Sequence, residues 1–131
     1  MTTEAAMKKV SVTIQQIIAA GDLSGLRELY RPDAVVWHNV DDTEKSVDTS
    51  LEMMQGMLSV TTKRWYEEVR LTPTHEGFVQ QHYTCAELVD GRSMRVPTCM
   101  VITLDGERVT RLEEYFESGA ATPMLELLGA P

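Results

Sequence analysis

Apolar residues return every three or four positions over the first part of the chain. The pattern runs through Met7, Val10, Ile14, Ile17 and Ile18. This spacing predicts an amphipathic helix, and Gly21 is a natural residue to end it.

A second, shorter helix is predicted between Asp22 and Pro32, because Asp22 is a suitable N-cap and proline does not continue a helix. Its apolar side is formed by Leu23, Leu26, Leu29 and Tyr30. The segment from Asp33 to Asn39 follows, and its Val-Val-Trp core predicts a short strand. An acidic loop, Asp41 to Glu44, leads to a third helix with Ser46 as its cap. The apolar positions of that helix are Val47, Leu51, Met54 and Leu58.

From Thr61 onward the pattern changes to β-branched and aromatic residues separated by turn signals. The strands predicted here are Lys63–Thr72, Phe78–Val89, Ser93–Leu104 and Arg108–Glu117. Glu76-Gly77 marks the first turn, and the Asp-Gly pairs at 90–91 and 105–106 are strong hairpin signals. Thr122 followed by Pro123 opens a short final helix. Its apolar side holds Met124, Leu127 and Leu128.

This order predicts one α+β domain over residues 1–131. The hairpins form a curved antiparallel sheet, and the three earlier helices are available to cover its inner face. A bent sheet wrapped over helices makes a cone whose open end is a natural place for a mostly apolar pocket. Strict alternation places Tyr66, Tyr83, Val101 and Tyr115, or their neighbours, on the outer face of the sheet. That face is too apolar for solvent, so we expect a homodimer that forms through the sheet.

Composition narrows the class of protein without naming a reaction. The chain has 131 residues, of which 43% are apolar and 24% charged, as in a globular domain. Its net charge of -8, with no cluster of Lys or Arg, argues against binding to nucleic acid. The chain has no run long enough to span a membrane and no apolar signal-peptide core near its start, so cytoplasmic residence is the default expectation.

The chain lacks the common metal and cofactor motifs. Cys85 and Cys99 have no CxxC spacing, and the three histidines are dispersed. There is no HExxH, Gly-rich phosphate loop or Gly-x-Ser-x-Gly elbow. We therefore expect no metal and no bound organic cofactor.

Two segments carry a resemblance to a known family. Residues 33–39, Asp-Ala-Val-Val-Trp-His-Asn, are similar to the first strand of the nuclear transport factor 2-like superfamily in its SnoaL-like branch. Residues 105–117, with a Gly-Glu-Arg-Val opening and a Glu-Glu-Tyr-Phe-Glu ending, resemble its last strand. The resemblance implies the cone-shaped fold and dimers through the sheet. The superfamily contains cyclases, isomerases, dehydratases and epoxide hydrolases, so the resemblance specifies the fold better than any reaction.

The nearest pattern within the superfamily is that of the limonene-epoxide hydrolases. Trp37-x-Asn39 looks like their Tyr-x-Asn, and Glu114 falls at their last Asp. His82 stands at their Arg and Thr84 at their first Asp. A threonine does not replace a carboxylate base, so this comparison argues against epoxide hydrolysis by that mechanism.

Strand parity singles out a pair of ionisable residues. Leu112, Glu114 and Phe116 share one face, and the two apolar neighbours indicate that Glu114 points inward. His82 and Thr84 share a face of an earlier strand. We expect His82 and Glu114 to form an acid/base pair on the pocket wall, because histidine exchanges protons near neutral pH. The alternative is a hydrogen-bonded polar pair with only a structural role.

Several further residues are candidates for substrate contact. They are Tyr30, Trp37, Asn39, Thr84, Thr98, Leu112 and Phe116. If Trp37 and Asn39 face the pocket, His38 faces away, and the reverse also holds. Whether the acidic loop closes over the pocket mouth is likewise left open.

The residues support three functions. The first is a cofactor-free enzyme that performs proton-transfer chemistry, such as isomerisation, dehydration, cyclisation or water addition, on a small apolar metabolite. The second is a non-catalytic ligand-binding protein of the same shape. The third is a protein-interaction module with a collapsed cavity.

Overall fold

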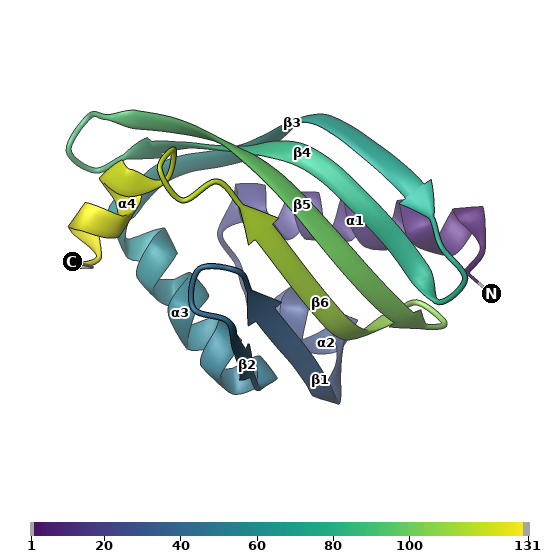
Figure 1. Cartoon of the computed structure of the whole chain (residues 1–131). Coiled ribbons are helices and arrows are strands. Elements are labelled where there is room, and N and C mark those ends of the chain that lie inside the picture. The colour runs from purple at the N-terminus through teal and green to yellow at the C-terminus, as the bar shows by residue number, and fades with distance from the viewer. Residues whose placement is uncertain (1, 130–131) are drawn as a thin grey trace.

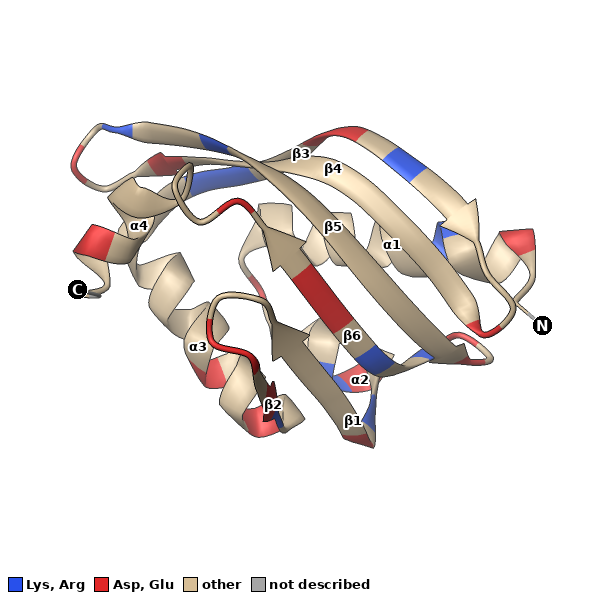
Figure 2. Ribbon diagram, viewed as in Figure 1, with Lys and Arg blue, Asp and Glu red and all other residues tan. Residues whose placement is uncertain are grey.

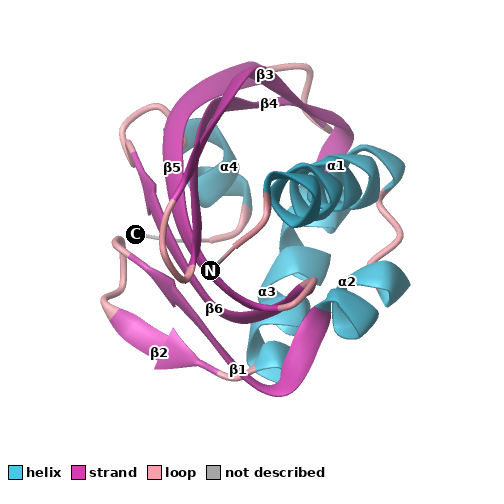
Figure 3. Cartoon of the chain, turned by 90° about the vertical axis from the view of Figure 1, so that its right-hand side faces the viewer, coloured by secondary structure: helices cyan, strands magenta, loops and turns pink. Residues whose placement is uncertain are grey.

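A single curved sheet wraps round the helices in this computed structural model of the chain, which describes residues 2–129 (Figure 1). The helices are α1 (Glu4–Ala20), α2 (Ser24–Leu29), α3 (Val47–Val60) and α4 (Thr122–Leu127). The strands are β1 (Tyr30–His38), β2 (Thr43–Lys45), β3 (Thr61–Pro73), β4 (Gly77–Leu88), β5 (Ser93–Asp105) and β6 (Arg108–Phe116). Seen from the side, the sheet bends without closing and holds the helices on its concave face (Figure 3). The predicted α+β fold is confirmed.

The strand order is β2-β1-β6-β5-β4-β3, so the first long strand lies beside the last. The hairpins β3–β4, β4–β5 and β5–β6 are antiparallel as predicted. The β1–β6 pair is parallel, which differs from an all-antiparallel sheet. The chain can form this pair because α3 and the whole meander lie between the two strands, and a parallel pair needs such a long crossover.

Local capping explains where α1 begins and ends. The Thr3 side chain accepts a hydrogen bond of 3.0 Å from the Ala6 amide. Gly21 ends the helix in the left-handed conformation, with φ of 72°. Glycine adopts that conformation without a Cβ clash, so the predicted stop is confirmed. The second helix is shorter than expected, because Tyr30 already belongs to β1.

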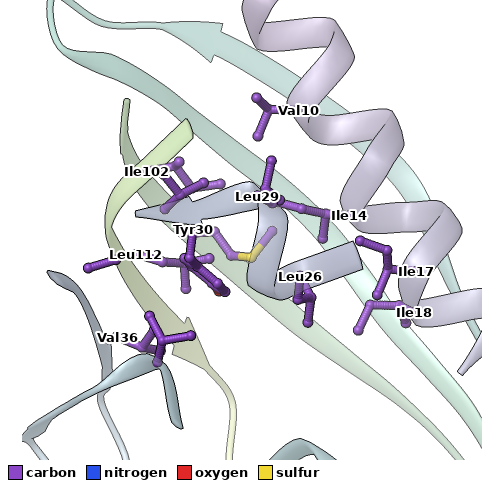
Figure 4. Close-up of a cluster of buried hydrophobic side chains, with 14 of the residues drawn as sticks. Val10, Ile14, Ile17, Ile18, Leu26, Leu29, Tyr30, Val36, Ile102 and Leu112 are labelled. Carbon is purple, nitrogen blue, oxygen red and sulfur yellow. The ribbon is translucent and has the colours of Figure 1, made fainter. Parts of the chain in front are cut away.

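The main core lies between α1, α2 and the inner face of the sheet (Figure 4). Figure 4 shows the α1 side chains pointing toward those of α2 and of the strands. Its labelled members are Val10, Ile14, Ile17, Ile18, Leu26, Leu29, Tyr30, Val36, Ile102 and Leu112. A smaller cluster beneath α4 contains Ala86, Leu88, Met94, Val96 and Ala121. Among helices within residues 2–129, none is long and apolar enough to cross a membrane.

Strand β3 carries a bulge that strict alternation did not predict. Glu68 has a φ of 53°, and the register against β4 shifts between Glu67 and Arg70. One extra residue in a strand reverses the faces of all residues beyond it. Tyr66 and Leu71 therefore both pack against the core. The prediction of Tyr66 on the outer face is wrong for this reason.

The predicted acidic loop contains the short edge strand β2. Lys45 forms an ion pair of 2.7 Å with Asp41, and Arg111 of β6 forms one of 2.6 Å with Glu44. The Trp37 indole donates a 3.0 Å hydrogen bond to Asp42. Figure 2 shows the acidic positions of this segment close to β1. The charged positions of β3–β6 are spread more thinly along the sheet. These contacts tie the segment to the edge of the sheet.

Candidate active site

A cavity of about 230 Å³ lies between the inner face of the sheet and helices α1, α3 and α4. Most of its wall is apolar, with methionines from α3, α4 and the strands: Met53, Met54, Met57, Met94, Met100 and Met124. The polar residues that line it include His38, Tyr30, Tyr66, Thr84, Thr98 and Glu114. The cavity is therefore suited to an apolar molecule with a few polar groups.

The partner of Glu114 is His38. Parallel pairing of β1 and β6 places His38 opposite Glu114, and both side chains point inward. The His38 Nε2 atom lies 3.1 Å from Glu114 Oε1. The expected contact between His82 and Glu114 is not formed, because the β1–β6 pair brings a different histidine to the carboxylate.

The geometry specifies how His38 holds this carboxylate. Its Nδ1 atom is buried without a hydrogen-bonding partner among the described residues. A proton on Nδ1 would be a buried donor with no acceptor, so the arrangement favours a ring that carries its proton on Nε2 and donates to Glu114. Glu114 Oε2 has no hydrogen bond from residues 2–129. That oxygen is the one open to a ligand.

Two tyrosines share the cavity with Glu114. Burial, and after it the negative charge of Glu114, raises the pKa of Tyr30. Burial also raises the pKa of Tyr66, with smaller contributions from Glu114 and Tyr30. Both phenols are therefore protonated near neutral pH. Within the described chain neither hydroxyl is hydrogen-bonded, so each can donate to a ligand oxygen.

His82 lies behind Tyr66 and not on the cavity surface. The two rings stack with centroids 3.8 Å apart and 19° between their planes. The side chain of His82 is buried, with its residue only 4% exposed. Burial lowers the pKa of His82 to about 4, and the charge of Glu114 opposes this only in part. His82 is thus neutral at physiological pH.

The other predicted contact residues divide into two groups. Thr84, Thr98, Leu112, Phe116 and Tyr30 line the cavity. Trp37 instead packs on the outer face against Tyr115, with ring centroids 5.0 Å apart. Asn39 bonds to the backbone of Phe116 and does not line the cavity. The position of Trp37 and Asn39 is a correction: His38 faces inward, so its two neighbours on the strand face elsewhere.

Sequence reasoning gave too little weight to two residues of this site. The sequence left open whether His38, or instead Trp37 and Asn39, faces the pocket. Only the β1–β6 pairing places His38 opposite the inward-facing Glu114. Tyr66 appeared to face outward, and only the bulge at Glu68 turns it inward. Glu68 is not a residue type that favours a positive φ, so the sequence offers no local signal for this bulge.

The profile of the SnoaL-like domain family matches residues 12–112. The chain belongs to this family, which confirms the resemblance that the first and last strands indicated. Among curated proteins, none matches the chain.

Solved structures share the fold at low sequence identity. A candidate SnoaL-like polyketide cyclase from Shewanella denitrificans OS-217 has a TM-score of 0.78 at 12% identity, covering 95% of this chain and 98% of its own. PrhC from Penicillium brasilianum NBRC 6234 has a TM-score of 0.82 at 11% identity, and the match covers 98% of this chain and 91% of PrhC. AclR, a candidate hydroxylase from Streptomyces galilaeus, has a TM-score of 0.79 at 17% identity, and the match covers 98% of this chain and 88% of AclR. At these identities the likeness concerns the fold alone.

Proposed function

We propose that this protein is a cofactor-free enzyme that transfers protons on a small, mostly apolar metabolite held in the cavity. The observation that carries the proposal is the His38–Glu114 pair, 3.1 Å apart and facing an apolar cavity. A carboxylate held by one oxygen, with the other open, suits a general base. Polyketide cyclases among the structural neighbours suggest aromatic ketones as the first substrates to test.

The proposed chemistry follows from the roles that the side chains can take. Glu114 removes a proton from a carbon next to a carbonyl group and returns it elsewhere on the substrate. Tyr30 and Tyr66 donate hydrogen bonds to the carbonyl oxygen as negative charge develops there. His38 keeps the carboxylate in place by donating from Nε2. In this scheme Glu114 is the catalytic base, while His82 supports Tyr66 from behind and does not touch the substrate.

Proton transfer can be measured without knowing the natural substrate. The assay is deuterium incorporation next to the carbonyl of 1-tetralone in D₂O, followed by NMR. We expect the wild-type protein to accelerate exchange and Glu114→Gln to lower the rate by about 10²- to 10⁴-fold, the usual contribution of a general base. Glu113→Gln is the matched control, because Glu113 is the residue before Glu114 on β6 and faces outward, beside Arg111. Wild-type exchange rates in Glu114→Gln would refute the assignment.

The second candidate is a ligand-binding protein without catalysis, which the same cavity supports. The two functions differ in one result. A binding protein takes up 1-tetralone with no acceleration of exchange, and Glu114→Gln then changes affinity only. The interaction module is less favoured, because the interior contains a cavity of about 230 Å³.

The outer face of the sheet supports a proposed homodimer. Tyr115 is 44% exposed there and packs against Trp37 with tilted rings, while Tyr83 and Val101 are half-buried on the same face. An exposed aromatic surface of this kind favours self-association. Light scattering at several concentrations tests it: Tyr115→Glu should shift a dimer to monomer, and a wild-type monomer at every concentration would refute it.

A further inference from the structure

A line of buried and half-buried polar side chains runs from α1 to the cavity. Gln15 Nε2 donates to Ser11 Oγ at 3.1 Å, and Ser11 Oγ donates to Gln80 Oε1 at 2.7 Å. Gln80 Nε2 lies 3.1 Å from His82 Nδ1. The line continues on the other side of the His82 ring. His82 Nε2 is 3.1 Å from Thr84 Oγ1, which is 2.8 Å from Thr98 Oγ1.

The cavity end of the line determines where its protons lie. Thr98 Oγ1 donates its one proton to the Val96 carbonyl at 3.0 Å. The proton between the two threonines must therefore come from Thr84. Since Thr84 has then used its proton, it can only accept from His82, so the His82 proton is on Nε2.

The helix end of the line gives the same answer independently. Ser11 donates to Gln80 Oε1, so the amide group of Gln80 faces His82 with its NH₂ end. An NH₂ group donates, and His82 Nδ1 must accept. Both ends thus assign the same tautomer of a neutral ring. All hydrogen bonds of the line point from α1 toward the Val96 carbonyl.

This direction has a consequence for the cavity. Thr84 and Thr98 both line it, and both hydroxyl protons are used inside the protein. Each oxygen keeps one lone pair. A threonine wall of this kind accepts hydrogen bonds but has no proton to donate.

We propose that the Thr84–Thr98 wall selects ligands that present a hydrogen-bond donor, such as a phenolic or enolic hydroxyl. The inference rests on the proposed function in one respect, that the cavity holds a small molecule. It deepens that function by naming the ligand class: an apolar ring compound with a hydroxyl toward Thr84 and a carbonyl toward Tyr30 and Tyr66. The tyrosines donate and the threonines accept, so one side of the cavity binds a hydrogen-bond acceptor of the ligand and the other side binds a donor.

The tautomer of His82 is the first test and needs no ligand. Long-range ¹H–¹⁵N NMR spectra distinguish Nε2–H from Nδ1–H in a neutral ring, and His82→Gln identifies the signal. We expect Nε2–H at pH 7. The Nδ1–H tautomer would overturn the proposal, because Thr84 would then donate to His82 Nε2 and no proton would remain for its contact with Thr98. A charged ring would overturn it as well, because Nδ1–H cannot accept from the Gln80 amide group.

Calorimetric binding of two matched probes is the second test. 2-Naphthol has a hydroxyl donor, and 2-methoxynaphthalene has the same skeleton without one. In Thr84→Val we expect the affinity for 2-naphthol to fall about 3- to 10-fold, the effect of one hydrogen bond, with 2-methoxynaphthalene unchanged.

Thr98→Val gives the sharper result, because it frees the Thr84 proton without removing the Thr84 hydroxyl. We expect 2-methoxynaphthalene to bind more tightly and 2-naphthol to lose its advantage. Equal responses of both probes in both variants would overturn the donor selection and leave the proposed enzyme standing. Failure of the wild-type protein to bind either probe would count against the small-molecule cavity, and so against both proposals.

Discussion

The side chain of Asn39 pairs with the backbone of Phe116 as a strand residue would. Asn39 Nδ2 donates to the Phe116 carbonyl and Asn39 Oδ1 accepts from the Phe116 amide, each at 3.1 Å. The backbone amide of Asn39 also donates to the Glu114 carbonyl at 3.1 Å. These bonds extend the β1–β6 pairing just past His38. They hold the register that brings His38 to Glu114.

Removal of the Asn39 side chain should therefore weaken both the fold and the site. We expect Asn39→Ala to lower the free energy of unfolding by about 1–3 kcal/mol, because two hydrogen bonds to Phe116 are lost. Urea denaturation measures this change. Gln55→Ala, at an exposed position on α3, is the control and should stay within about 0.5 kcal/mol of wild type. Equal stability of the two variants would show that the Asn39 pair does not stabilise the register.

His82 makes stability depend on pH in a defined window. Its pKa is lowered from 6.5 to about 4 by burial, so the unfolded chain binds a proton that the folded protein does not. The free energy of unfolding therefore falls as pH drops from above 6.5 to about 4, by roughly 3 kcal/mol from this residue. Above 6.5 the contribution is constant.

The contribution of His82 is isolated by measuring the free energy of unfolding of the wild-type protein and of His82→Gln at several pH values. Carboxylates titrate in both proteins and cancel in the difference. We expect the wild-type curve to fall more steeply between pH 6.5 and 4. Parallel curves would mean that His82 is not buried in its neutral form.

The bulge in β3 can be tested through backbone strain at Glu68. Its φ of 53° suits glycine and opposes β-branched residues. We expect Glu68→Val to be less stable than Glu68→Gly by about 1–2 kcal/mol. Both variants lose the same 2.9 Å ion pair with Arg95, so that contact cancels in the comparison. Equal stabilities would indicate that this position has an ordinary extended backbone.

The cavity tyrosines can be tested in the deuterium exchange assay with 1-tetralone. Tyr66→Phe should lower the exchange rate on the order of 10²-fold, as expected for loss of one donor to a developing oxyanion. Tyr30→Phe should act in the same direction. Tyr115→Phe is the matched control on the outer face, where the hydroxyl is remote from the cavity, and it should exchange at the wild-type rate. If Tyr66→Phe also keeps that rate, Tyr66 only lines the cavity.

Much of the fold follows from local patterns. The 3.6-residue period predicted α1, and the Asp-Gly pairs predicted hairpins whose glycines, Gly91 and Gly106, have φ of 89° and 61°. The inward side of β6 followed from the apolar neighbours of Glu114. These features depend on residues a few positions apart, so one chain segment is enough to specify them.

The partner of Glu114 needed more than local pattern. Strand parity pointed to His82, which lies in the predicted meander, as the partner of Glu114. The choice of His38 depends on the parallel pairing of β1 with β6, which brings together His38 and Glu114 from positions 76 residues apart. Strand pairing at that separation is decided by the packing of α3 and the meander, which no single segment encodes.

The helices, the hairpins and the inward position of Glu114 can be predicted from the amino-acid sequence, because each depends on periodicity or on residue types within one element. The contact of His38 with Glu114, the inward turn of Tyr66 and the place of His82 behind it come from the packed fold, because each depends on the register between strands. One extra residue at Glu68 and one parallel pair at the edge of β6 reverse or select whole faces of strands, and those choices are made by the packed fold.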